Sequence, residues 1–175
     1  MNAIASRQAP SASDDQVARA RGVLAGVPDP EIPVLSLVDL GIIRSVEAGP
    51  DGTLTVGVSP TYSGCPATAV IRADIIAALE TEGFPRVRVL DVLSPPWTSD
   101  WISDDGRRKL EAYGIAPPPA PVASVRALAS PEPSPRCPRC GSADTELVSE
   151  FGSTPCKALH RCRACLEPFD RFKCI

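Results

Sequence analysis

Histidine is scarce in this sequence: among 175 residues it occurs only as His160. A nucleophilic cysteine is usually activated by a nearby base, and no histidine accompanies the isolated Cys65. The sequence also lacks a glycine-rich phosphate loop, a dinucleotide-binding fingerprint, and a Glu-x-x-His pair of the kind that holds a di-iron centre. These absences argue against an enzyme and indicate a non-catalytic protein.

Long apolar runs are also missing. No segment approaches the eighteen consecutive apolar residues of a membrane-spanning helix, and the start, MNAIASRQAPSASDDQ, does not resemble a secretory signal. We therefore expect a cytoplasmic protein without a membrane partner, in which paired cysteines more often bind metal than form disulfides. The formal net charge of −3 lacks the basic excess that is typical of a nucleic-acid binder.

Proline, by contrast, is abundant and unevenly placed. Of the 20 prolines, seven lie between Pro117 and Pro135, where they favour an extended, semi-rigid spacer. This predicts a flexible tail at 1–13, a first domain at 14–115, a linker at 116–135 and a cysteine module at 136–175. Such a linker also favours two modules that fold independently.

The first domain shows alternating helical and strand patterns. Apolar spacing and turn signals predict an α+β domain with helices on one face of a small sheet. Ser13 is the expected cap of the first helix, and the turn AGPDG joins the first two strands into a hairpin. The expected helices cover residues 14–27, 66–82 and 104–113, and the expected strands cover 42–47, 53–59 and 86–93.

Cys65 lies in PTYSGCPATAV, where a loop is predicted to become a helix. If Pro66 is the first helical residue, Cys65 is the N-cap, and the unpaired N–H groups there favour a thiolate. A small buried thiol is the alternative, because free cysteine is often buried. Asp29 and Glu31, in the loop DPEIP, could supply oxygen ligands or a base, although exposed loop acids are commonly only solvated.

The C-terminal module contains two C-x-x-C pairs, separated by 21 residues. Two such turns can place four thiolates around one tetrahedral ion. With strands expected at TELVSEF and EPFDRF, this spacing predicts a zinc ribbon whose metal contributes folding energy to a module too small to bury a large core. An iron–sulfur cluster is the alternative occupant. The expected ligands are Cys137, Cys140, Cys162 and Cys165.

Two further thiols, Cys156 and Cys174, remain outside this pattern. They could be buried thiols, alternative ligands, or the reason why the module carries an iron–sulfur cluster. His160 is expected at the surface and not as a ligand. Seven Lys/Arg against five Asp/Glu in residues 136–175, without an aromatic platform, again argue against nucleic acid. Three phenylalanines are expected to form the ribbon's small core: Phe151, Phe169 and Phe172.

Several of these segments carry a resemblance to known families. DPEIPVLSLVDLGIIRSV and SPTYSGCPATAVI resemble the small α+β family of iron–sulfur carrier and assembly proteins that includes SufT. Its characteristic Asp-Pro-Glu loop and its cysteine before the second helix match Asp29, Pro30, Glu31 and Cys65. With SPPWTSDWISDDGRRKLEAYGIAPP and the cysteine module, the chain resembles PaaD-type accessory subunits of bacterial phenylacetyl-CoA epoxidase systems.

The resemblance implies a supporting role for that multisubunit oxygenase. Its subunits or its reductase would be the protein partners, and Cys65, with Asp29 and Glu31, would transiently hold iron or an iron–sulfur cluster. The alternative is a structural or docking subunit that transfers no metal. A homo-oligomer is possible, and Trp97 and Trp101 could either pack against the sheet or form a docking patch.

Overall fold

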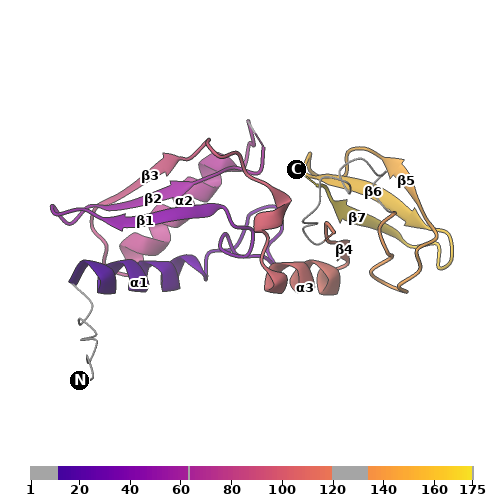
Figure 1. Ribbon diagram of the computed structural model, residues 1–175, viewed down its shortest axis with the longest axis horizontal. Coiled ribbons are helices and arrows are strands. Elements are labelled where there is room, and N and C mark those ends of the chain that lie inside the picture. Colours follow the sequence, from indigo (N-terminus) through magenta and orange to yellow (C-terminus); the bar gives the residue numbers. More distant parts are fainter. Residues whose placement is uncertain (1–11, 63, 120–133, 175) are drawn as a thin grey trace, which may run out of the picture.

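The computed structural model describes residues 12–62, 64–119 and 134–174 of the chain (Figure 1). The predicted tail and most of the predicted linker therefore lie outside the described residues. No helix in the described part is long and apolar enough to cross a bilayer. The elements are α1 (Ala12–Leu24), β1 (Ile43–Ala48), β2 (Leu54–Val58), α2 (Thr68–Thr81), β3 (Val87–Asp91), a 3-10 turn η1 (Ser99–Trp101), α3 (Asp104–Tyr113), β4 (Ile115–Ala116), β5 (Thr145–Ser149), β6 (Lys157–Cys162) and β7 (Pro168–Phe172).

The N-terminal sheet has the strand order β1-β2-β3. The predicted hairpin is confirmed as the antiparallel pair β1–β2, and β3 lies parallel to β2 after the crossover through α2. Val46, Val56 and Val89 are register neighbours across the three strands, and all three are buried. The helices α1 and α2 contact each other and the sheet (Figure 1), so one face carries the main core. The α+β class expected from the sequence is confirmed.

The helix α3 begins and ends where the sequence predicts. Ser103 is its N-cap, accepting a hydrogen bond from the backbone N–H of Gly106 at 2.9 Å. Gly114 ends the helix in the left-handed conformation, φ 92°, which glycine adopts without steric cost. For α1 the expected cap is wrong: the helix already begins at Ala12, so Ser13 lies inside its first turn.

Asp39 attaches the long loop after α1 to α3. Its carboxylate accepts hydrogen bonds from the backbone N–H and the hydroxyl of Ser36 at 2.9 and 2.8 Å, and it pairs with the Lys109 ammonium at 2.8 Å. Burial by itself favours the protonated form, but the Lys109 and Ser36 bonds outweigh it and lower the pKa of Asp39. The loop is thus held in place at the end of the domain where the cysteine module begins.

The C-terminal sheet has the order β4-β7-β6-β5. β5 and β7 correspond to the two predicted strands, whereas the sequence pattern predicts neither β6 nor the short β4. β4 immediately follows α3, yet it pairs in parallel with β7, with Ile115 opposite Asp170. The end of the first domain is therefore a strand of the ribbon's sheet, and Figure 1 shows this sheet beside α3.

The two modules also share one hydrophobic core. Phe172 of β7 is 1% exposed and belongs to the same buried cluster as the core of the first domain. Its ring lies 6.0 Å from that of Trp97, whose indole N–H donates to the carbonyl of Leu40 at 2.9 Å. Trp97 is thus a core residue and not a docking patch, and Trp101 lies half-buried beneath the guanidinium of Arg44. This packing argues against independently folding modules.

Two other expectations for the ribbon are wrong. Phe151 is 67% exposed, because it lies in the loop after β5 and beyond the sheet that would cover it. His160 is buried, because its position in the central strand β6 stacks its ring on Phe169 at 5.7 Å. Phe169 itself packs in a small second cluster with Ala116, Cys137 and Cys162.

We predict that Phe172→Ala destabilises the whole chain and not only the ribbon. Truncating a fully buried phenylalanine typically costs about 3–5 kcal/mol, and this one fills the core beside Trp97. Urea unfolding followed by tryptophan fluorescence and by far-UV circular dichroism measures the loss. The matched control is the exposed Phe151→Ala, expected to change stability by less than about 1 kcal/mol. Equal effects of the two substitutions would contradict the shared core.

Candidate functional site

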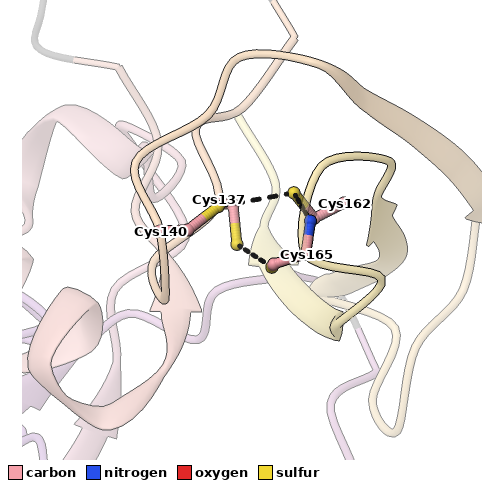
Figure 2. Close-up of side chains that lie close together, drawn as sticks. All are labelled: Cys137, Cys140, Cys162 and Cys165. Atoms are coloured by element: carbon pink, nitrogen blue, oxygen red, sulfur yellow. Dashed lines mark hydrogen bonds between the residues drawn. The ribbon is translucent and has the colours of Figure 1, made fainter.

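Four cysteine side chains meet at one end of the ribbon (Figure 2). All four sulfurs lie within 4.8 Å of one another. The contact between Cys137 and Cys165 is 3.7 Å, and that between Cys140 and Cys162 is 3.6 Å. A tetrahedral ion with metal–sulfur bonds of ~2.3 Å requires sulfur separations of about 3.8 Å. The four residues therefore have the donor type and spacing for one tetrahedral metal ion.

Each C-x-x-C turn is completed by a left-handed residue directly after its second cysteine. Gly141 has φ 74° and donates its N–H to the carbonyl of Cys137 at 2.8 Å. The corresponding residue of the second turn is Leu166, with φ 66° and a side chain that is 71% exposed. Such a backbone conformation costs a non-glycine residue about 1–2 kcal/mol. The ribbon therefore stores strain beside its clustered cysteines, a feature that the sequence pattern does not reveal.

The pKa values of two of these thiols are shifted in opposite directions. The backbone N–H of Cys165 lies 3.5 Å from the sulfur of Cys162 and lowers the pKa of Cys162 to about 7. At Cys165, a hydrogen bond from the backbone of Glu167 lowers the pKa, but burial and the neighbouring thiols outweigh it and raise the pKa to about 12. A cation bound among these sulfurs would offset the repulsion between thiolates and so favour the ionised form of Cys165.

A second group of reactive side chains surrounds a small cavity between the first domain and the ribbon. Its volume is about 20 Å³, enough for about one water-sized atom. Asp29, Glu31, Cys65 and Cys156 line it, together with apolar side chains that include Ile32, Leu40, Ile42 and Phe172. The structure therefore brings the three sequence-predicted residues of the first domain to one place, and it adds Cys156 to them.

Asp29 shapes the acidic loop. Only 6% exposed, it accepts hydrogen bonds through one carboxylate oxygen from the backbone N–H groups of Glu31 and Ile32, at 2.9 and 2.8 Å. Burial outweighs these bonds and raises the pKa of Asp29. The pKa of Glu31 is also raised, first by burial and then by the charge of Asp29. The cavity therefore holds two carboxylates whose negative charge is poorly compensated.

The ammonium group of Lys157 does not form an ion pair with either carboxylate. Lys157, buried in β6, forms its ion pair with Asp170 at 3.2 Å. Its charge lowers the pKa of both Asp29 and Glu31, but less than burial raises it. Within the described residues neither carboxylate belongs to an ion pair.

Cys65 is half-buried at the cavity, but it is not the N-cap of α2. The helix begins at Thr68, with Ala67 at the N-cap. Cys65 lies one turn earlier, where its carbonyl accepts a hydrogen bond from the N–H of Thr68 at 3.2 Å. The predicted cap is therefore wrong, because Pro66 and Ala67 form a turn before the helix starts. Burial and the adjacent Cys65 raise the pKa of the nearby Tyr62 to about 12.

Cys156 comes from the ribbon, immediately before β6. It is buried, and its sulfur lies 3.1 Å from the Thr154 hydroxyl and 4.0 Å from a carboxylate oxygen of Glu31. Burial raises the pKa of the Cys156 thiol. No sequence spacing links it to Cys65, since 91 positions separate them and only the packing of the two modules brings them together. Cys174 is exposed and does not line this cavity.

Two family models match the chain. Residues 18–90 match a family described as "Iron-sulfur cluster assembly protein", and residues 121–173 match the "PaaD zinc beta ribbon domain". The first match runs from within α1 into β3, and the second includes β5, β6 and β7. A crystal structure from Bacillus anthracis, titled "Domain of Unknown Function DUF59", is similar to the first module, with a TM-score of 0.52 and 26% identity over 56% of this chain and 93% of that one.

Curated relatives match either nearly the whole chain or about half of it. An Escherichia coli protein, named as one subunit of a "Putative 1,2-phenylacetyl-CoA epoxidase", is 50% identical over 160 residues, which are 91% of this chain and 94% of the relative. A Porphyromonas gingivalis "Fe-S protein maturation auxiliary factor" is 36% identical over 50% of this chain and 84% of its own length. The Staphylococcus aureus factor SufT is 35% identical over 43% of this chain and 85% of its length.

We predict that removal of the ribbon's metal shifts the fluorescence of Trp97 to longer wavelength. Loss of the ion unfolds the ribbon, and the departure of Phe172 then exposes the indole to water. The measurement is emission during titration with a strong chelator, beside metal analysis of the same samples. Trp97→Phe, which keeps Trp101, is the control and should remove most of the shift. A metal-free protein with unchanged Trp97 emission would refute the prediction.

We also predict that Glu31→Gln slightly stabilises the metal-free protein at neutral pH. The raised pKa of Glu31 means that its ionised form is less favourable in the folded chain than in the unfolded chain, so folding loses stability as pH rises from about 4 through the folded pKa. The gain should stay below about 1 kcal/mol for this half-exposed group and vanish below pH ~4. Thermal melts of both proteins across this range provide the measurement, and a gain that persists at low pH would exclude the mechanism.

Proposed function

The chain belongs to the PaaD-type family represented by the E. coli relative, and from this membership we propose that it is a non-catalytic accessory protein of a phenylacetyl-CoA epoxidase system. In this proposal it assists the loading or maturation of metal in the oxygenase or its reductase. The first half of the chain supports a maturation role, because its curated relatives are iron–sulfur protein maturation factors.

The observation that carries the proposal is the cavity that unites Cys65 with Asp29 and Glu31. A thiol and two carboxylates suit iron, whereas the surroundings offer no histidine base for covalent catalysis: His160 does not line this cavity. The volume of about 20 Å³ accommodates a single ion but not a multi-iron cluster. We therefore propose that the cavity, at its present size, takes up iron as a single ion. A cluster would require a larger cavity.

The ribbon's four cysteines would hold a different, structural metal. Two of their sulfur separations are 3.6 and 3.7 Å and all lie within 4.8 Å, which suits one tetrahedral ion. A cluster of several irons would hold thiolates on different irons farther apart. We propose zinc, bound by Cys137, Cys140, Cys162 and Cys165, as the resident ion that stabilises the ribbon.

A docking role of the ribbon is compatible with the maturation role. β5 is an edge strand of the ribbon's sheet, and it carries the exposed apolar residues Leu147 and Val148. Such an edge is suited to contact with another protein. If no metal is transferred, this surface supports the alternative function of a purely structural subunit.

The test is to produce the oxygenase and its reductase together with the Cys65→Ser variant of this chain. Their iron content and ring-epoxidising activity are then measured. We expect both to fall about tenfold, as is typical when a metal-site residue is lost. The matched control is Cys174→Ser, which removes an exposed thiol outside the cavity and should leave both values unchanged. Normal iron loading beside Cys65→Ser would eliminate metal handling at Cys65 and leave the docking function.

A further inference from the structure

We propose that the ribbon completes the cargo site: Cys156 joins Cys65 and Glu31 in binding one divalent cation of the Fe²⁺/Zn²⁺ class between the two modules. The inference rests on the proposed function, and it adds a ligand that neither the family models nor the relatives assign. The cargo would then be held by both halves of the chain.

The geometry around Cys156 supports this assignment. Its sulfur lies 4.0 Å from a carboxylate oxygen of Glu31, and both residues line the cavity with Cys65. A thiolate and a carboxylate on one tetrahedral ion are separated by about 3.6 Å, given bond lengths of ~2.3 and ~2.1 Å. A small rotation of either side chain thus suffices to place both on one ion, and the cavity has room for it.

The donor atoms that line the cavity favour one class of ion. Two sulfur and two carboxylate donors favour borderline cations such as Fe²⁺ and Zn²⁺ over Mg²⁺ and Ca²⁺, which prefer oxygen ligands alone. Asp29 and Glu31 also lack an ion-paired partner within the described residues, because Lys157 is engaged by Asp170. A bound cation would supply the missing positive charge.

The two candidate metal sites differ in how close together their donor atoms lie. Within the described residues, only the four ribbon cysteines have their donor atoms all within 4.8 Å of one another. The donors around the cavity must draw together when an ion enters. This favours weaker, exchangeable binding at the cavity, as cargo requires, and tight binding in the ribbon, as a structural ion requires.

The chain also couples the two environments. Cys156 precedes β6, and β6 ends at the ribbon ligand Cys162. The neighbouring strand β7 places Phe172 at the wall of the cavity. If the ribbon loses its metal and unfolds, Cys156 and Phe172 therefore leave the cargo site.

The experiment uses the full chain, reduced and loaded with one equivalent of zinc, and Co²⁺ as the probe. Zinc holds the ribbon against Co²⁺, which binds such sites more weakly. Anaerobic titration should show one further equivalent of Co²⁺ with sulfur-to-cobalt absorbance. Cys156→Ala and Cys65→Ser should each weaken this binding by about tenfold or more and remove about half of the absorbance per bound ion, since one of two thiolates is lost. The control Cys174→Ser should titrate like the wild type.

Cys156 is buried, so circular dichroism must show that Cys156→Ala folds. If it does not, Glu31→Gln decides, because this half-exposed side chain can change without a cavity: binding weakened about tenfold with unchanged absorbance per ion supports the site, and unchanged affinity overturns it.

The inference is also overturned if the zinc-loaded wild type takes up no second ion, or if folded Cys156→Ala binds Co²⁺ normally. Should Cys156→Ala bind normally while Cys65→Ser still lowers oxygenase iron, the proposed function stands without a ligand from the ribbon. Normal oxygenase iron beside Cys65→Ser would instead remove the proposed function itself.

Discussion

Burial of Phe172 against Trp97 holds the two halves of the chain together. A ribbon of about forty residues cannot bury enough apolar surface to fold alone. The core of the first domain is one source of its stability, and a metal ion bound by its four clustered cysteines would be a second. Because β4 continues the first domain into the ribbon's sheet, the backbone reinforces the same junction. The ribbon's position is thereby set relative to the acidic loop.

That position gives the cavity its composition. The first domain by itself would present Cys65, Asp29 and Glu31 to solvent on one side. With the ribbon packed on it, the same residues face Cys156 across a space the size of one small ion. Burial removes the water that would stabilise the charged forms, which explains why the pKa values of both carboxylates and of the Cys156 thiol are raised. An acidic, sulfur-containing cavity of this kind costs stability unless a cation enters it, so the proposed function and the stability of the metal-free chain oppose each other at this site.

Sequence reasoning succeeds where the physical signal is local. It predicts the helix α3 to the residue, because the Ser103 cap and Gly114 each act within one turn of the chain. Each C-x-x-C turn is predicted for the same reason, because its four residues are consecutive in the chain. Such reasoning fails where distant contacts decide. The pattern assigns Phe172 to the ribbon's own core, whereas the residue enters the first domain, and β4 has too few residues to carry any pattern.

Spacing and periodicity are enough to predict the α+β class and the two cysteine turns with their four-thiol site, and the resemblance of particular segments indicates the family. The signals for these features are short segments of the chain. Packing between distant segments establishes the remainder: Cys65 precedes its helix by a turn, His160 is buried, and Cys156 faces Glu31. Each depends on which surfaces pack together and exclude water; Cys156 and Glu31, separated by 125 positions, become neighbours only when the modules pack.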